Sequence, residues 1–422
     1  MSGPVTRAPI AVLGGGVYAA RLAEVVAATA GLAPLELRLH ARDRARLATI
    51  AAHADGRLRA SPHCVRACPE LDDALSGAAA VVLLVRVGGM AARAHDESFP
   101  HRHGLVGDEG VGVGGMANAW RTLPVLDRIA RRIAACAAGA PVLNLVAPLG
   151  VTTRLLVERG LAAVGLCELP VVTLARWRGR AGPAAAALDY AGLNHLGFFW
   201  SARQAALDHP VLRAAVEAGD VPAEILAQLE AAPLHYYVDV FEPDAARRIG
   251  RHRRPGRAGE LALLQAVLLR RFRDAPGDPV AELERRSTPW FEQALVPALH
   301  AALGGPTYAA AIDLVNRAGA GRALDEAPEA VVVELFGRLD TSGARFDPVA
   351  TRPDPVRGML GRLARAEDLL YRAALLRDRE LLAEALDALP VAWSRSDADR
   401  AALLDHICFP VPAIPDSEMR RP

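Results

Sequence analysis

Short apolar runs alternate with longer segments of helical periodicity along the first part of the chain. The apolar runs have the length of buried strands and are rich in Val, Leu and Ala: 9–13, 35–39, 78–85, 141–146 and 161–166. Between them, apolar residues recur at the helical period, as in 19–30, 44–53 and 123–137. Strands that alternate with helices in this way predict an α/β fold with a largely parallel sheet.

Three glycines, Gly14, Gly15 and Gly16, stand between the first apolar run and the first helical segment. With Ala19 they match the pattern G-x-G-x-x-G/A, in which Gly14 makes a tight turn and Gly16 lets a pyrophosphate approach the backbone. Because the strand precedes the pattern and the helix follows it, we expect a Rossmann-type dinucleotide site. An ordinary glycine-rich turn is the alternative.

The end of the second strand lacks the acid that usually holds the ribose of NAD. Residues 40–43 read His-Ala-Arg-Asp. Arg42 suits the 2′-phosphate of NADP, and Asp43 could reach the ribose from one turn later. We therefore expect NAD, with NADP as the alternative, or a weakened cofactor site.

Glycines and charged residues are concentrated between residues 86 and 115. They follow the carboxyl end of a predicted strand, which is where open α/β sheets bind their ligands. We expect a long ligand-binding loop here, followed by a helix that starts at Met116. A solvated surface loop is the alternative.

Cys167 and His195 each follow an apolar run, at 161–166 and 184–190, where a predicted strand ends. A thiolate and an imidazole suit a first-row metal, and two protein ligands leave most of the coordination sphere open, as catalysis requires. The alternative is a buried thiol and a core histidine without a metal.

Length and composition limit the functional classes. The chain has 422 residues, of which 52% are hydrophobic, and its net charge is +1; it is long enough for two lobes and too nearly neutral for a nucleic-acid partner. It contains no lysine, which excludes lysine Schiff bases and a Walker-type phosphate loop. No run is long enough to span a bilayer, and five cysteines without a leader segment before Ile10 predict a reduced, cytoplasmic protein.

The chain resembles glycoside hydrolase family four, the NAD- and divalent-metal-dependent 6-phospho-glycosidases and related glycosidases. The resemblance extends from about residue 10 to 406 and rests on the glycine turn and on segments 86–97, 107–122, 165–167, 189–195, 316–317, 331–334, 367–369 and 385–386. It implies a lactate/malate-dehydrogenase-like fold. We expect a Rossmann domain over 1–170, then an α+β substrate and oligomerisation domain over 171–422 with a short proline-rich tail.

The resemblance also implies a mechanism and a set of site residues. NAD⁺ removes hydride from C3 of the sugar, a metal polarises the C2 and C3 oxygens, a tyrosine takes the C2 proton, and the aglycone leaves by elimination before water adds at C1. The roles it assigns are: metal (Mn²⁺ or another divalent ion), Cys167 and His195; cofactor, Gly14, Gly15, Gly16, Arg42, Arg86 and Asn144; substrate, Arg93, Glu109 and Asn194; base, Tyr236, with Tyr237 as alternative. The basic run 251–254 could hold a sugar phosphate or be a solvated surface.

Several positions depart from the family pattern. Ala147 stands where an asparagine usually contacts the sugar, Glu168 stands where Asn, Asp or His follows the cysteine, Ala41 replaces the ribose acid, and Gly110 replaces a threonine. A lost amide removes a hydrogen bond worth on the order of 1 kcal/mol, so ordinary 6-phospho-glucosides should bind poorly. Glu168 is a candidate general acid.

Two classes of function follow. The first is an enzyme that acts on a changed sugar substrate, as a glycosidase or as a redox-dependent lyase or epimerase of specialised metabolism. The second is a non-catalytic descendant that binds a nucleotide or a protein. The paired Cys167 and His195 favour the enzyme, because a scaffold has no need of them. We expect a homodimer or homotetramer without nucleic-acid or membrane partners.

Overall fold

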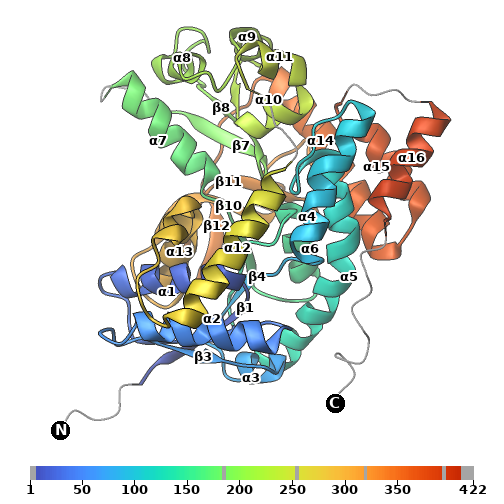
Figure 1. The fold of residues 1–422 in the computed structure, drawn as a ribbon. Coiled ribbons are helices and arrows are strands. Elements are labelled where there is room, and N and C mark those ends of the chain that lie inside the picture. Colours follow the sequence, from blue (N-terminus) through green and yellow to red (C-terminus); the bar gives the residue numbers. More distant parts are fainter. Residues whose placement is uncertain (1–5, 183–186, 252–255, 318–320, 392–395, 410–422) are drawn as a thin grey trace.

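The computed structural model describes residues 6–182, 187–251, 256–317, 321–391 and 396–409, and their strands form one twisted sheet (Figure 1). The order across the sheet is β3 (Cys64–Ala67), β2 (Leu35–His40), β1 (Ala8–Gly14), β4 (Ala80–Leu84), β5 (Val142–Asn144), β6 (Ala163–Leu166), β10 (Tyr308–Val315), β11 (Val332–Asp340), β7 (Asp189–Leu193), β8 (Leu196–Trp200) and β9 (Ala232–Pro233). A further strand, β12 (Gly343–Phe346), pairs with β11.

The half of the sheet from β3 to β6 is parallel, which confirms the predicted α/β fold. Its helices are α1 (Ala19–Ala28), α2 (Arg44–Arg57), α3 (Leu71–Leu75), α4 (Gly89–Ser98), α5 (Gly112–Cys136) and α6 (Leu149–Glu158), with the 3₁₀ turns η1 (Gly16–Tyr18) and η2 (Phe99–His103). Side chains alternate between the two faces: Ile10 and Val12 join the core beneath α1 and α2, whereas Ala11 and Leu13 join the core beneath α5.

The other half of the sheet is antiparallel, starting where β10 pairs with β6. Its helices are α7 (Leu169–Ala181), α8 (Pro210–Glu217), α9 (Ala223–Leu229), α10 (His235–Phe241), α11 (Pro243–Arg248), α12 (Arg257–Asp274), α13 (Val296–Ala302), α14 (Asp354–Leu376), α15 (Arg379–Ala388) and α16 (Asp397–Ile407), with the short η3 (Ala281–Arg285) and the π-helical η4 (Phe291–Leu295). The domain boundary that we predict at residue 170 falls at the start of α7, next to this change of strand direction.

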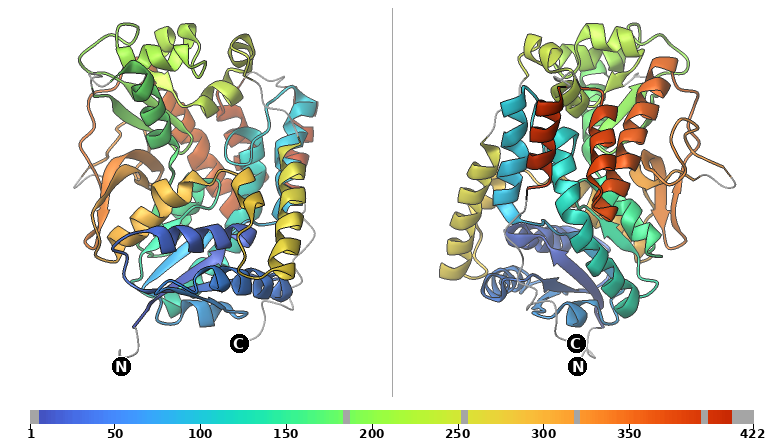
Figure 2. Two further views of the ribbon diagram at one scale, coloured as in Figure 1. Left: turned by 60° about the vertical axis from the view of Figure 1, so that its left-hand side comes forward. Right: turned by 90° about the vertical axis from the view of Figure 1, so that its right-hand side faces the viewer.

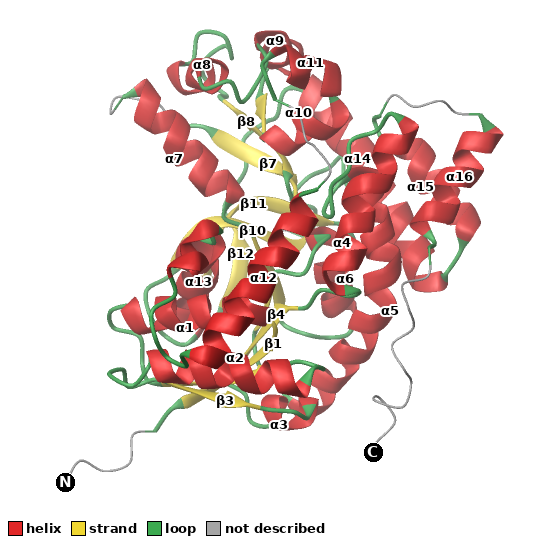
Figure 3. Cartoon of the chain, in the orientation of Figure 1, coloured by secondary structure: helices red, strands yellow, loops and turns green. Residues whose placement is uncertain are grey.

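Later helices pack on the parallel half, so the two halves share side-chain contacts as well as a sheet. Helix α14 lies along α5, and α12 lies over α2 and α4 (Figures 2 and 3). His53 of α2 stacks on Phe272 of α12 with 3.8 Å between the ring centres. No helix in the described segments combines the length and the apolar character needed to cross a membrane.

The prediction of a long loop over residues 86–115 is wrong, because the segment contains α4 and η2. Helix α5 also begins at Gly112 rather than Met116 and runs without a break for 25 residues through Pro124. The glycines serve close packing here: a Cβ on Gly114 would overlap the carbonyl oxygens of Asp96 and Asp108. Glycine in this segment therefore marks tight contact between backbones rather than an open loop.

The strand expected over 184–190 is shifted in the structure. Residues 183–186 lie outside the described residues, and β7 begins at Asp189 and continues to Leu193. β7 and β8 are paired from Asp189 with Trp200 to Leu193 with Leu196. His195 therefore lies in the two-residue turn of a β-hairpin.

Candidate active site

A cavity of about 770 Å³ lies between the glycine turn after β1 and the hairpin turn of β7 and β8, with α12 as a further wall. The predicted site residues that line it are Gly14, Gly15, Gly16, Arg86, Arg93, Glu109, Cys167, Glu168, Asn194, His195 and Tyr236. Arg42 and Asn144 are not among the described residues that line it. Most of the predicted site residues thus line one cavity.

The glycine turn leaves room for a ligand next to its backbone. Gly14 has φ +93°, and a Cβ on it would lie 2.6 Å from the carbonyl oxygen of Leu84. Gly15 donates its N–H to the same oxygen at 3.2 Å. Gly16, with φ +53°, leads directly into η1. A strand, a bare turn and a helix in this order suit the phosphates of a dinucleotide.

Arg42 lies outside the cavity, contrary to the prediction. Asp43 caps α2 by accepting the N–H of Arg46 at 2.9 Å, and the side chain of Arg42, just before this cap, is exposed. Arg46 is one helical turn further on and lines the cavity; its Nη2 lies 4.0 Å from the position of a Cβ on Gly16. Arg42 thus precedes α2 and points to solvent, whereas Arg46 of α2 lines the cavity.

Asn144, which we predicted to contact the cofactor, also lies away from the cavity. Its side chain is completely buried and donates to the hydroxyl groups of Thr152 at 3.0 Å and Thr153 at 2.9 Å. Its amide oxygen accepts the N–H of Val146 at 3.1 Å. These bonds join the end of β5 to α6, so the side chain has a structural use away from the cavity.

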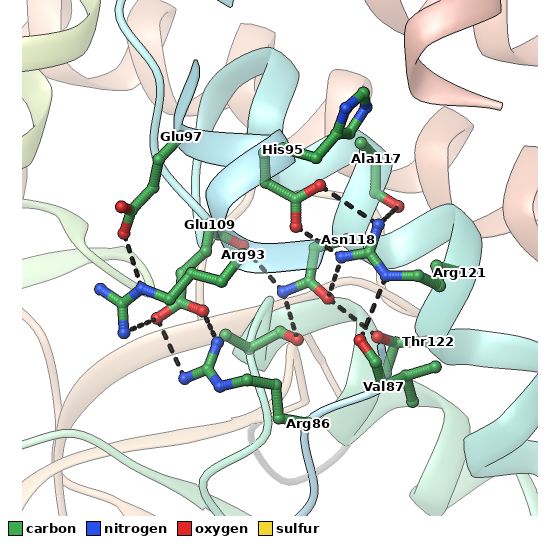
Figure 4. A network of polar contacts seen from close by, with 12 residues as sticks. Arg86, Val87, Arg93, His95, Glu97, Glu109, Ala117, Asn118, Arg121 and Thr122 are labelled. Atoms are coloured by element: carbon green, nitrogen blue, oxygen red, sulfur yellow. Dashed lines mark hydrogen bonds and ion pairs between the residues drawn. The ribbon is translucent and has the colours of Figure 1, made fainter. Parts of the chain in front are cut away.

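Arg86 and Arg93 hold Glu109 in the cavity wall (Figure 4). Arg93 donates to Glu109 at 3.0 Å and to Glu97 at 2.6 Å, and Arg86 pairs with the other oxygen of Glu109. Asn118, which we did not predict, donates to the carbonyl oxygen of Glu109 at 2.9 Å. The network orients four charged side chains before any ligand enters.

Arg86 lies close to two further arginines of the cavity wall. Burial, together with repulsion from Arg93 and Arg286, lowers the pKa of the Arg86 guanidinium to about 9. Arg286 also lines the cavity, with its guanidinium over the rings of Tyr18 at 4.6 Å and Trp290 at 5.0 Å. Glu109 already offsets part of the repulsion between Arg86 and Arg93, and a ligand anion beside Arg286 would offset more of it.

Cys167 directly follows β6 and has a buried side chain, 5% exposed. Burial raises the pKa of its thiol well above the ordinary value, and the nearby carboxyl groups of Glu334, Glu168 and Asp313 raise it further. The thiol therefore keeps its proton unless a cation lies next to it. A divalent metal would stabilise both the thiolate and these acids, so the donor set fits such an ion.

His195 has φ +66°, a conformation that few non-glycine residues adopt. Its ring stacks on Tyr236, with 4.2 Å between ring centres and 25° between planes. Among the described residues, no group of three or more His, Cys, Asp or Glu side chains is arranged to hold a metal. Cys167 and His195 would thus leave most of the coordination sphere to water and substrate.

Tyr236 is better placed than Tyr237 to act on a ligand. Tyr236 lines the cavity between the rings of His195 and His235, whose centre is 4.5 Å away. Tyr237 is 2% exposed and packs edge-on against Phe198 at 5.4 Å. The geometry therefore favours Tyr236 as the candidate base.

Two buried acids that we did not assign to the site lie behind Cys167. Asp313 of β10 and Glu334 of β11 are register partners and are completely buried. Gly165 of β6 pairs with Asp313, and Gly192 of β7 pairs with Glu334, so the acids form one row with glycines at both ends. Burial raises the pKa of both carboxyl groups, that of Glu334 to about 7. The signal for them in the sequence was an acid with apolar neighbours on both sides, Asp313 between Ile312 and Leu314 and Glu334 between Val333 and Leu335.

Glu334 connects this row to the hairpin turn. Its carboxyl group accepts hydrogen bonds from the amide nitrogen of Asn194 at 3.1 Å and from the hydroxyl of Tyr190. Tyr190 lies across Gly197, where a Cβ would be 2.5 Å from ring carbon Cε2 and closer still to the hydroxyl. Since Glu334 uses the amide nitrogen of Asn194, the amide oxygen is the end left to face the cavity.

The remaining predicted positions differ in their access to the cavity. Burial raises the pKa of the Glu168 carboxyl group, which lines the cavity. Ala147 lines it as well, and its carbonyl oxygen accepts from Asn118 at 3.0 Å. Arg251 pairs with Asp239 at 2.9 Å, and residues 252–254 of the predicted basic run lie outside the described residues.

Comparison with known proteins gives a consistent picture. The model of the family described as "Family 4 glycosyl hydrolase" matches residues 9–178, and that of "Family 4 glycosyl hydrolase C-terminal domain" matches residues 190–391. The 6-phospho-beta-glucosidase of Escherichia coli (strain K12) is 26% identical over 355 residues, which are 78% of this chain and 78% of that protein.

Solved structures share the fold. The 6-phospho-beta glucosidase of Thermotoga maritima, solved with manganese, NAD+ and glucose-6-phosphate, superposes with a TM-score of 0.77 at 20% identity, over 95% of this chain and 97% of that chain. A lactate dehydrogenase from a Medee basin deep-sea metagenome library gives a TM-score of 0.51 at 15% identity, over 88% of this chain and 99% of that chain. The expected likeness to lactate dehydrogenase is confirmed at the level of the fold.

Proposed function

Because the chain belongs to family 4 of the glycosyl hydrolases, we propose that it is a glycosidase for phosphorylated sugars that uses a nicotinamide dinucleotide and a divalent metal such as Mn²⁺. The names of the Escherichia coli relative and the Thermotoga maritima structure support this class of substrate and these cofactors. The observation that carries the proposal is that Cys167, His195 and Tyr236 line the same cavity as the glycine turn.

The cofactors would make the sugar acidic at C2 for this chain's own base. When bound, the dinucleotide accepts a hydride from C3, and the metal polarises the oxygens on C2 and C3. Tyr236 would then take the C2 proton, held in position by the rings of His195 and His235. Loss of that proton and of the C1 oxygen would form a C1–C2 double bond, and water would then add across it, with its oxygen at C1 and a proton returned to C2 by Tyr236.

Glu168 would donate a proton to the departing oxygen on C1. Burial raises the pKa of its carboxyl group, which favours the protonated form that a general acid needs. It lines the cavity next to Cys167, close to where the metal would hold the sugar. General acid catalysis of this kind contributes about 10² to 10⁴ in rate.

Arg86, Arg93 and Glu109 would bind the sugar and its phosphate. Glu109, which both guanidinium groups hold in place, can accept hydrogen bonds from sugar hydroxyl groups, and the N–H donors of Arg86 and Arg93 that Glu109 leaves free can bind the phosphate. Ala147 provides no amide toward the cavity, so we also propose that the preferred sugar differs from those of the named relatives. The predicted homodimer or homotetramer stays a prediction that light scattering would test.

The experiment follows the C2 hydrogen in heavy water, with glucose 6-phosphate as the probe together with Mn²⁺, NAD⁺ and NADP⁺. Proton NMR should show loss of the C2 signal as deuterium enters, because the phenol proton of Tyr236 exchanges with solvent. Tyr236→Phe should abolish the exchange and leave dinucleotide binding intact, since only the proton-accepting atom is removed.

Tyr237→Phe is the matched control. This neighbouring ring is buried away from the cavity, so its variant should keep the exchange of the wild type. Exchange that persists in Tyr236→Phe and is lost in Tyr237→Phe would move the base to Tyr237. A wild-type protein that cleaves 6-phospho-glycosides without C2 exchange would contradict the proposed mechanism.

A further inference from the structure

Among the described residues that line the cavity, none of the acids comes from the end of β2. After β2, Ala41 is apolar, and the ring nitrogen Nδ1 of His40 bonds to the carbonyl oxygen of Cys68 at 2.9 Å. Asp43 uses its carboxylate to cap α2. The acids that do line the cavity come from other segments: Glu97, Asp108, Glu109 and Glu168.

Arg46 occupies this end of the cavity instead. Its Nη2 lies 4.0 Å from the position of a Cβ on Gly16, and it donates to the side-chain oxygen of Gln265 on α12 at 3.0 Å. The Nε atom is buried and has no hydrogen-bond partner among the described residues. Among the described residues, the guanidinium of Arg46 hydrogen-bonds only to a neutral amide and has a buried N–H donor without an acceptor, so it is suited to bind an anion.

We propose that Arg46 binds the 2′-phosphate of NADP and that this chain prefers NADP to NAD. The inference rests on the proposed function, because it requires that the glycine turn bind a nicotinamide dinucleotide. In dinucleotide folds, an acid after the second strand holds the ribose hydroxyl groups of NAD and repels a phosphate, whereas an arginine nearby accepts the phosphate. Here the acid is replaced by Ala41 and the arginine lies in the cavity.

The contact of Arg46 with Gln265 adds a second consequence. Gln265 belongs to α12, which lies over α2, so the two side chains bridge the cavity edge beside the glycine turn. A phosphate bound to Arg46 would lie at the contact between these two helices. NADP binding should therefore protect the backbone amides of α12 from hydrogen exchange more than NAD binding does.

Binding titrations test the preference. NAD⁺ and NADP⁺ are titrated separately by calorimetry, without sugar or metal, so that the readout is independent of activity. We expect NADP⁺ to bind about 10- to 100-fold more tightly, as one additional charge-assisted contact allows. Adenosine 2′,5′-bisphosphate should likewise bind more tightly than ADP, which isolates the 2′-phosphate.

Two arginines on the same segment make a matched pair of variants. Arg46→Gln should weaken NADP⁺ binding to the level of NAD⁺, and Arg42→Gln should leave the ratio unchanged because that side chain is exposed outside the cavity. Ala41→Asp should restore the missing acid and reverse the preference toward NAD⁺. This variant decides the matter if Arg46→Gln fails to fold.

Each contrary result has a distinct meaning. NAD⁺ binding as tightly as NADP⁺ in the wild type would overturn the inference and leave the proposed function standing. A preference lost in Arg42→Gln and kept in Arg46→Gln would overturn the role of Arg46. Absence of binding by either dinucleotide would overturn the proposed function itself.

Discussion

Gly197→Ala is expected to destabilise the protein strongly through a clash with one tyrosine. Gly197 lies on β8, and the new methyl group would be 2.5 Å from Cε2 of Tyr190 and closer still to its hydroxyl. Tyr190 is 1% exposed and cannot swing into solvent without leaving the core. The ring must therefore move away from Glu334, and the buried hydrogen bond between them is lost.

The magnitude follows from two separate costs. Forcing an additional methyl group into a packed core costs about 1–3 kcal/mol. Leaving a buried polar group without its partner costs about 1–3 kcal/mol. The free energy of unfolding should therefore fall by about 2–6 kcal/mol.

Urea denaturation followed by tryptophan fluorescence would measure the loss, because Trp200 lies on the same strand as Gly197. Gly179→Ala is the matched control. Gly179 lies in α7, and apart from its own helix backbone no atom of the described residues stands within 4 Å of the added Cβ, so helix propensity predicts a gain of about 0.5–1 kcal/mol. In a Tyr190→Ala background the methyl at 197 should cost much less, since the ring is gone. A Gly197→Ala protein within about 0.5 kcal/mol of the wild type would refute this reasoning.

Three further predictions concern the metal, the leaving group and pH. Cys167→Ser and His195→Ala should each lower Mn²⁺ binding, measured by calorimetry, whereas Cys136→Ser, away from the cavity, should not; equal binding in all of them would contradict the metal site. Glu168→Gln should slow cleavage of methyl 6-phospho-glycosides by about 10² to 10⁴ and change 4-nitrophenyl glycosides far less, because only the poor leaving group needs a proton donor; equal slowing of both would remove the acid role. Burial raises the pKa of Glu367 to about 8 from 4.5, so the folded state holds a proton that the unfolded state releases, and stability should fall as the pH rises from about 4.5 to 8. Urea midpoints at pH 5 and pH 8 should show a smaller fall for Glu367→Gln, and an unchanged fall would exclude Glu367 as the cause.

The sequence predicted features whose signal is local. The glycine turn has its strand and helix as neighbours in the chain, and Cys167 directly follows its strand, so their positions in the fold could be inferred. Arg42 failed as a prediction because the cap at Asp43 sets where the helix begins and hence which arginine turns inward. The sequence has arginines at 42, 44 and 46, and its composition does not distinguish them.

Features that depend on distant segments could not be predicted. Asp313 and Glu334 lie on strands that pair with each other and with β6 and β7, and nothing near either acid in the chain specifies this register. Asn144 resembled a ligand-binding side chain until the structure placed Thr152 and Thr153 against it. Whether a polar residue serves a ligand or the core is decided by such tertiary contacts.

The position of β10 and β11 between β6 and β7 determines when the site can form during synthesis. Cys167 and His195, which follow β6 and β7, leave the ribosome early. The strands β10 and β11, which lie between β6 and β7 in the sheet, are synthesised only with residues 308–340. Until then β6 has an unpaired edge, which is the kind of edge that favours aggregation. Nascent chains that end before residue 308 should therefore depend on chaperones and expose the Cys167 thiol to alkylating reagents, and both properties should disappear once β10 and β11 have inserted.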